Sequence, residues 1–217
     1  MNRAAAAGIS DPKWDRVIER FCAIGRASVE RGLVVGSAGN LSARDPETGE
    51  IIVTATGTFF DALTRDTFAL LSASGEHLDG PKPSSEWRLH HGVYAVRPDA
   101  TVVMHLHPEY SVMLDELGLP IRQHILDHVA YVPKIGRIPF FPNGSEALAE
   151  AASEAMRGCD AIVLGNHGCS VLSTDPDDAF RKAQNLEQAA RMTYRMALLG
   201  DRTTEFPQEL RATAMHA

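Results

Sequence analysis

Apolar residues near the start of the chain recur at the spacing of a helix. Trp14, Val17, Ile18, Phe21 and Ile24 would share one face of such a helix. The sequence Ser-Asp-Pro at residues 10–12 precedes them and is a typical helix start. We therefore expect a first amphipathic helix that ends near residues 31–32, where glycine follows arginine.

Further along, short apolar runs bounded by turn residues predict strands, and helical spacing predicts helices. We expect strands over residues 41–44, 51–56, 68–72, 101–107, 137–140, 161–164 and 170–172. We expect helices over residues 84–96, 109–117, 143–156 and 175–199, the first of them capped by Ser84 or Ser85. Residues 118–136 show no period and are expected to be irregular. Because hairpins occur among the alternating strands and helices, the sequence predicts a mixed α/β layered domain.

Length, net charge and cysteine content exclude several classes of protein. The length of 217 residues favours one domain over residues 1–217, and the net charge of −7 argues against nucleic-acid binding. No apolar run approaches the ~20 residues of a membrane helix, so we expect no membrane partner. The three cysteines form no CxxC pair, which disfavours a cysteine zinc site. The first residues lack the apolar stretch of a secretory signal, and we expect a cytoplasmic protein.

Three histidines follow apolar strands. His105 and His107 are two residues apart, so on a strand both imidazoles would point to one face and converge, as metal ligands must. Two surface histidines at a strand end would give the same pattern. His167 stands between Gly165 and Gly168 after another apolar strand, either as a third ligand or as an ordinary turn residue. Three imidazoles would leave a metal one open position, which is typical of catalytic sites.

Ser84, Ser85 and Glu86 stand at the start of an expected helix, where free backbone N–H groups favour an anion. The same residues could equally be an N-cap and an ordinary acidic residue of a first turn. Two loops of small residues, 37–40 and 56–58, could cradle a phosphate, although most such loops are turns. Neither loop has the pattern of a nucleotide-binding loop.

The remaining histidines and Tyr131 are weaker indications of a functional site. His124, His128 and Tyr131 lie in the irregular stretch 118–136, and long irregular stretches in compact domains are often functional. His90 follows Glu86 by one helical turn, and we expect it to hydrogen-bond a neighbour rather than bind a metal.

Five of these pieces, taken together and in order, resemble the class II aldolase/adducin family. They are residues 36–42, 56–57, 83–88, 105–107 and 166–168, and they span most of the chain. Each piece alone is weak, but five in order are specific. The sequence Pro-Ser-Ser-Glu-Trp-Arg at 83–88 resembles the fuculose-phosphate aldolase branch in particular.

The resemblance implies a three-layer α/β/α fold with a mixed, largely antiparallel central sheet. It implies a divalent metal on His105, His107 and His167, with Glu86 as the catalytic acid/base and fourth ligand. Zn²⁺ suits these donors best, and Mn²⁺, Co²⁺ or Fe²⁺ also fit. The implied site for a substrate phosphate consists of Ser37, Asn40, Thr56, Gly57, Ser84 and Ser85.

The resemblance also implies a homotetramer with active sites between subunits. The expected activity is that of an aldolase, which cleaves a fuculose- or ribulose-1-phosphate-like ketose to dihydroxyacetone phosphate and an aldehyde. Alternatives are a decarboxylase of a phosphorylated 3-keto sugar acid, of the 3-oxo-tetronate 4-phosphate type, and a sugar-phosphate 4-epimerase. Family epimerases usually carry Asp where this chain has Glu86, which favours the aldolase. Adducin-type relatives keep the fold as a binding scaffold, but this chain retains every histidine of the implied site.

The chain departs from the family's pattern in one place. Fuculose-phosphate aldolases use a tyrosine of a neighbouring subunit as proton donor, and near that position this chain has Gln123, His124 and Ile125. His124 or Tyr131 is therefore the candidate proton donor. The segment 201–217 either closes over a site or forms an exposed tail.

Overall fold

An eight-stranded sheet forms the centre of the structure, a computed structural model that describes residues 8–214. The strand order is β4-β3-β2-β1-β5-β8-β7-β6, and neighbours are antiparallel except β6 and β7. The strands are β1 (Gly39–Arg44), β2 (Ile51–Thr54), β3 (Phe68–Leu71), β4 (His77–Asp79), β5 (Val102–Leu106), β6 (Ile135–Ile138), β7 (Ala161–Leu164) and β8 (Gly168–Ser173). Residues 1–7 lie outside the described part of the chain. The expectation that the chain begins without a secretory signal concerns these residues.

Helices complete the chain between and after these strands. The α-helices are α1 (Asp15–Glu30), α2 (Trp87–Val96), α3 (Glu109–Glu116), α4 (Leu126–Tyr131), α5 (Glu146–Met156), α6 (Pro176–Leu198) and α7 (Arg211–Ala214). Short 3₁₀ helices cover Pro12–Trp14, Phe60–Ala62, Arg65–Thr67 and Gln208–Leu210. Local signals fix the start of the longest helix, since Asp175 accepts the backbone N–H of Asp178 at 2.9 Å and Pro176 follows it.

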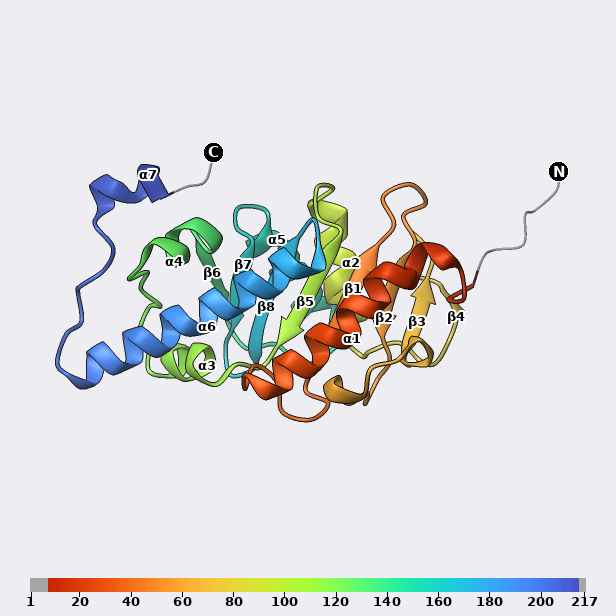
Figure 1. The fold of residues 1–217 in the computed structure, drawn as a ribbon, viewed down its shortest axis with the longest axis horizontal. Helices are drawn as coiled ribbons and strands as arrows, with labels where there is room; N and C mark the ends of the chain where they lie inside the picture. Colours follow the sequence, from red (N-terminus) through yellow and green to blue (C-terminus); the bar gives the residue numbers. More distant parts are fainter. Residues whose placement is uncertain (1–7, 215–217) are drawn as a thin grey trace.

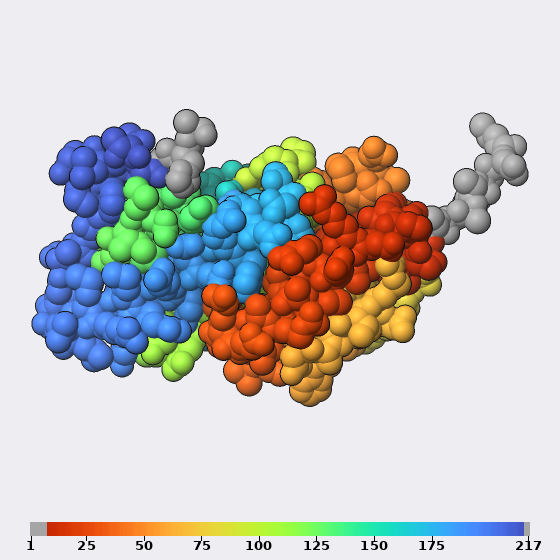
Figure 2. All heavy atoms as spheres, viewed as in Figure 1, coloured from red at the N-terminus to blue at the C-terminus, as the bar shows by residue number. Residues whose placement is uncertain are grey.

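Two helical layers enclose the sheet. Helices α1 and α6 lie side by side over one face and form the middle of the surface seen in Figure 2. Helices α2 and α5 pack against each other on the opposite face. Successive side chains of β5 point to opposite faces of the sheet: Met104 and Leu106 pack with α1 and α6, whereas Val103 packs with α2 and α5. The predicted three-layer α/β/α fold with a mixed, largely antiparallel sheet is confirmed.

Four local predictions are wrong. Neither Ser84 nor Ser85 caps α2, because the helix begins only at Trp87 with Glu86 at the N-cap position. The stretch 118–136 contains α4, a helix that its tertiary contacts with α6 hold in place. The edge strand β4 was not predicted, and β6 begins earlier than expected. Strand β6 includes Gly136, which was expected to lie in the irregular stretch. A Cβ at this position would stand 2.8 Å from the sulfur of Cys159, so only glycine lets the strand lie this close to Cys159.

None of the helices within residues 8–214 combines the length and apolar character needed to cross a bilayer. The part of the C-terminal segment that is described, 201–214, packs against the loop before α4. There the backbone N–H of Phe206 donates to the carbonyl of Gln123 at 2.6 Å, and Arg122 pairs with Asp201 at 3.2 Å. In Figure 1 the segment runs from the end of α6 to α7, beside α4.

Candidate metal centre

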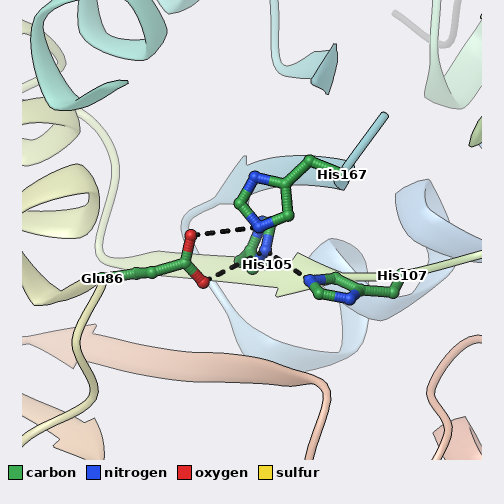
Figure 3. Close-up of side chains that lie close together, drawn as sticks. All are labelled: Glu86, His105, His107 and His167. Atoms are coloured by element: carbon green, nitrogen blue, oxygen red, sulfur yellow. Dashed lines mark hydrogen bonds and ion pairs between the residues drawn. The ribbon is translucent and has the colours of Figure 1, made fainter. Parts of the chain in front are cut away.

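Four side chains from distant parts of the sequence meet at one end of β5 (Figure 3). They are Glu86, His105, His107 and His167, and their candidate ligand atoms all lie within 4.8 Å of one another. The Nε2 atoms of His105 and His107 are 2.9 Å apart. The two carboxylate oxygens of Glu86 lie 3.3 Å from Nε2 of His105 and 3.3 Å from Nε2 of His167. The expectation that these four residues lie together agrees with the structure.

The ends of secondary-structure elements supply all four groups. His105 lies on β5 and His107 directly follows the strand, so the spacing of two residues places both imidazoles together. His167 stands in the tight turn between β7 and β8, where Asn166 has a φ of 52°. Glu86 is the N-cap residue of α2, and α2 covers the face of the sheet to which Val103 and His105 of β5 point.

Two glycines allow the strands that carry these residues to come this close. A Cβ on Gly168 would stand 2.4 Å from the carbonyl oxygen of Leu106 and 2.8 Å from a ring carbon of His107. A Cβ on Gly39 would stand 2.7 Å from the carbonyl oxygen of His105, and Gly39 has a φ of 123°. Any side chain at either position would push β5 away from its neighbour.

Burial keeps the central histidines neutral. Desolvation, followed by the charges of its histidine neighbours, lowers the pKa of His105 well below the usual value. Desolvation likewise lowers the pKa of His107 to about 4, with His167 as the second cause. At neutral pH these imidazoles therefore offer electron pairs rather than positive charge to the group between them, as metal ligation requires.

Contacts outside the cluster fix its geometry. Nδ1 of His105 lies 3.1 Å from the hydroxyl of Ser170, its partner across β5 and β8. With a proton on Nδ1, Nε2 of His105 presents its lone pair to the cluster. The chain after His107 is anchored by the buried carboxylate of Glu187 on α6, which accepts the backbone N–H groups of Tyr110 and Ser111 at 2.8 and 2.9 Å.

One oxygen of the cluster accepts no hydrogen bond from any residue within 8–214. Oε1 of Glu86 is buried and accepts no hydrogen bond, and Nε2 of His167 lies 3.3 Å from it. A buried carboxylate oxygen without a hydrogen bond is costly. A divalent cation among the imidazoles would satisfy that oxygen. Three imidazoles and one carboxylate are a donor set that suits Zn²⁺ and related cations. The residues present therefore fit a metal ion.

The loops expected to hold a phosphate lie next to one another. The backbone N–H of Thr56 donates to the carbonyl of Lys82 at 3.1 Å, and that of Phe60 donates to the carbonyl of Gly36 at 3.1 Å. Gly57 has a φ of 73° and open space where a side chain would stand. Of the residues predicted for this site, Asn40 and Ser84 are buried, whereas Ser37, Thr56, Gly57 and Ser85 are exposed.

The two candidate proton donors lie against α6 instead. Nε2 of His124 is 2.9 Å from the hydroxyl of Thr193, and the guanidinium of Arg181 lies 5.0 Å from the ring centre of Tyr131. Partial burial and the neighbouring Arg122 lower the pKa of His124. Neither His124 nor Tyr131 belongs to the group of four within its own chain, so their catalytic role stays a prediction.

A chain of buried polar residues behind Glu86 escaped the sequence reasoning. It runs from Asn40 through His90 and Ser42 to Tyr94, and it links β1, which carries Asn40 and Ser42, to α2, which carries His90 and Tyr94. One signal was available: polar Asn40 and Ser42 alternate with apolar residues along β1, although both faces of that strand are buried. The expectation that His90 bonds a neighbour is confirmed.

Comparison with known proteins identifies the family. The sequence profile of the Class II Aldolase and Adducin N-terminal domain matches residues 19–194. The chain belongs to the class II aldolase/adducin family. The resemblance recognised from the sequence is thus confirmed, and so is the prediction of an enzyme of the lyase class.

Relatives within this family carry more than one activity. An L-fuculose phosphate aldolase of Methanococcus maripaludis is 33% identical over 82% of this chain and 97% of its own length. A 3-oxo-tetronate 4-phosphate decarboxylase of Haemophilus influenzae is 32% identical over 81% of this chain and 86% of its own length. A solved L-fuculose 1-phosphate aldolase is 25% identical, covers 92% of this chain and 94% of its own, and superposes with a TM-score of 0.83.

Proposed function

We propose that this chain is a metal-dependent aldolase that cleaves a phosphorylated ketose, of the fuculose- or ribulose-1-phosphate type, into dihydroxyacetone phosphate and an aldehyde. The observation that carries the proposal is the buried Glu86 carboxylate, whose Oε1 accepts no hydrogen bond, together with the neutral imidazoles of His105 and His107. A carboxylate held there can both complete a cation's ligand set and exchange a proton with a substrate carbon. The fuculose-phosphate aldolase relatives support the same reaction class.

His105, His107, His167 and Glu86 would hold the metal, proposed to be Zn²⁺ with Mn²⁺, Co²⁺ or Fe²⁺ as alternatives. When bound, the cation supplies positive charge that stabilises an oxyanion next to the bond being broken. Because the imidazoles of His105 and His107 are neutral, they leave that charge uncompensated.

This chain's own residues would carry out the remaining steps. The exposed backbone and hydroxyl groups of Ser37, Thr56, Gly57 and Ser85, with Asn40 and Ser84 beside them, would bind the phosphate and so fix the orientation of the ketose. When the C–C bond breaks, its electron pair stays on the ketone half as an enediolate.

Glu86, which must take up one proton from solvent when the ketose binds, then delivers it to the carbon of that enediolate. The hydroxyl of the other half loses one proton as it becomes an aldehyde, so the two transfers balance. That second proton would pass through His124 or Tyr131 of a neighbouring chain.

We also propose that the enzyme is a cytoplasmic homotetramer with active sites between subunits. Two large apolar side chains beside the phosphate loops support an intersubunit contact there: Val35 is 80% exposed and Phe59 is 59% exposed. Light scattering on the purified protein tests the assembly, and a monomer at micromolar concentration would contradict it.

The test of the main proposal is consumption of dihydroxyacetone phosphate with lactaldehyde as acceptor, with and without EDTA. We expect consumption that EDTA abolishes and that added Zn²⁺ or Co²⁺ restores. Absence of consumption in protein with bound metal would refute the aldolase assignment.

The decarboxylase is the second candidate, because relatives with that activity match this chain nearly as well as the aldolases do. Loss of carbon dioxide from a phosphorylated 3-keto acid would leave the same type of enediolate for Glu86 to protonate. Lys134 and Arg137 are candidates to bind the carboxylate. Lys134 is exposed, whereas Arg137 already pairs with Asp115. Release of carbon dioxide from such an acid would decide for this reaction.

A further inference from the structure

Glu86 is the end of a continuous chain of buried hydrogen bonds. Its Oε2 lies 2.9 Å from Nδ2 of Asn40, whose Oδ1 is bonded to Nε2 of His90. Nδ1 of His90 lies 2.6 Å from the hydroxyl of Ser42, which lies 2.7 Å from the hydroxyl of Tyr94. All five side chains are buried, with His90 and Ser42 at 0% exposure.

An ionised Glu86 fixes the arrangement of protons from Asn40 to Ser42. The carboxylate of Glu86 accepts, so Asn40 must present its NH₂ group to it and its carbonyl oxygen to His90. That oxygen needs a donor, so the proton of His90 is on Nε2 and Nδ1 accepts from the hydroxyl of Ser42. Having given its proton to His90, the oxygen of Ser42 can only accept, and the hydroxyl of Tyr94 lies 2.7 Å from it and 3.0 Å from the carbonyl oxygen of Ser42. From Ser42 through His90 and Asn40, every donor therefore points toward Glu86.

The chemistry of the members limits what such a chain can do. Burial lowers the pKa of His90 to about 3, so the ring is neutral at working pH, as the proton arrangement requires. An amide does not pass protons on readily, so Asn40 interrupts any relay between His90 and Glu86. The chain therefore serves orientation: it fixes which end of the Asn40 amide faces the carboxylate.

We infer that His90 is a positioning residue for the metal centre: its Nε2–H locks the Asn40 amide so that Asn40 holds Glu86 against the three histidines. This inference rests on the proposed role of Glu86 as ligand and proton carrier. Without the lock, the Asn40 amide can turn its oxygen toward Glu86, and two acceptors would then face each other in a buried site. Residues that orient ligands typically affect metal affinity or activity by ~10–100-fold.

Two substitutions of His90 separate its hydrogen bond to Asn40 from its hydrogen bond to Ser42. His90→Gln keeps an amide N–H at about the reach of Nε2 and so keeps the bond to Asn40. His90→Asn reaches only to about Nδ1, so it keeps the bond to Ser42 and loses the one to Asn40. Each is compared with wild type for thermal unfolding, for Co²⁺ affinity by competition with a chelator, and for kcat and KM.

If His90 acts through Asn40, His90→Asn binds Co²⁺ ~10–100-fold more weakly and loses more in kcat than it gains in KM, whereas His90→Gln stays within about threefold of wild type. In a Glu86→Ala background the two variants bind Co²⁺ equally, because the effect passes through Glu86. A general packing defect would lower the affinity of both variants in both backgrounds. Two results would overturn the inference. One is equal Co²⁺ affinity of His90→Asn and His90→Gln in the chain that keeps Glu86. The other is a weaker Co²⁺ affinity of His90→Asn that persists in the Glu86→Ala background.

The same experiment distinguishes failure of the proposed function. If wild type binds Co²⁺ but turns over neither substrate class, the proposed reaction fails and the affinity comparison still decides the role of His90. If wild type binds no Co²⁺, the metal centre and the inference both fail.

Discussion

Replacing Gly168 by alanine should separate the proposed metal ligands without removing any of them. Gly168 directly follows His167 and pairs with Leu164 at the start of β8. A Cβ there would stand 2.4 Å from the carbonyl oxygen of Leu106, where ordinary van der Waals contact begins at 3.4 Å. The backbone of β8 or of β5 must therefore move by about 1 Å.

The size of the effect follows from this displacement. Backbone shifts forced by an added methyl group cost about 1–3 kcal/mol of unfolding free energy. Misplacement of reacting groups by ~1 Å typically costs ~10²-fold in rate. We expect Gly168→Ala to lose stability in that range, to bind Co²⁺ more weakly and to lose about two orders of magnitude in turnover. The activity loss should exceed what unfolding explains at a temperature where the variant stays folded.

Urea unfolding, chelator competition and turnover measure these three effects. Gly158→Ala is the matched control, since the atom nearest its added Cβ is the flexible end of Lys134, at 3.1 Å. That control should behave as wild type. If Gly168→Ala kept wild-type stability and Co²⁺ affinity, the argument that close strand approach builds the site would be refuted.

Three further predictions use other parts of the site. Glu86→Gln leaves the imidazoles in place, so bound Co²⁺ should remain while turnover falls ~10²–10⁴-fold, and undiminished turnover would exclude Glu86 as the proton carrier. His90 has a pKa of about 3 in the folded protein, so below its unfolded pKa of about 6.5 only the unfolded chain takes up this proton. Stability of the metal-free protein should therefore fall with acidification, and the slope from this group should rise from about 0.7 kcal/mol per pH unit at pH 6.5 to about 1.3 at pH 5. His90→Gln should show a shallower slope in urea titrations over the same range. Glu187→Gln places an NH₂ group against backbone N–H donors and should cost about 1–3 kcal/mol by urea unfolding, whereas Glu154→Gln on the exposed face of α5 should cost less than about 0.5 kcal/mol. Equal losses in those two variants would contradict the anchoring role of Glu187.

Strand periodicity was sufficient to place the two imidazoles of His105 and His107 together because that geometry is local, whereas their assignment with His167 to one metal site came from the family resemblance. His105 and His107 share a strand face whatever the tertiary fold, and the glycines around His167 predict a tight turn. Glu86 could be linked to them only through the resemblance to a family, since 19 residues separate it from His105. The strand register that brings β1 to β5 is a tertiary property with no local signature.

The parts that sequence reasoning missed depend on such long-range contacts. Helix α4 lacks an apolar period of its own, and its contacts with α6 stabilise it, including Nε2 of His128 at 3.2 Å from Gln188. The alternation of Asn40 and Ser42 indicated a polar sheet face, but only the packing of α2 on β1 shows that His90 joins them. Local propensity cannot reveal which side chain completes a buried bond.

The structure explains why two short pieces of the chain each pair a glycine with a polar residue. Gly39 has no Cβ to strike the carbonyl oxygen of His105, and this close approach places Asn40 directly opposite His105 in the strand register. Gly168 does the same between β8 and β5, and it brings His167 to the cluster. In both cases the glycine permits the strands to meet and the polar neighbour uses the space gained. The proposed metal centre therefore depends as much on two residues without side chains as on the four residues that would hold the ion, and substitution of either glycine should damage the site as surely as loss of a ligand.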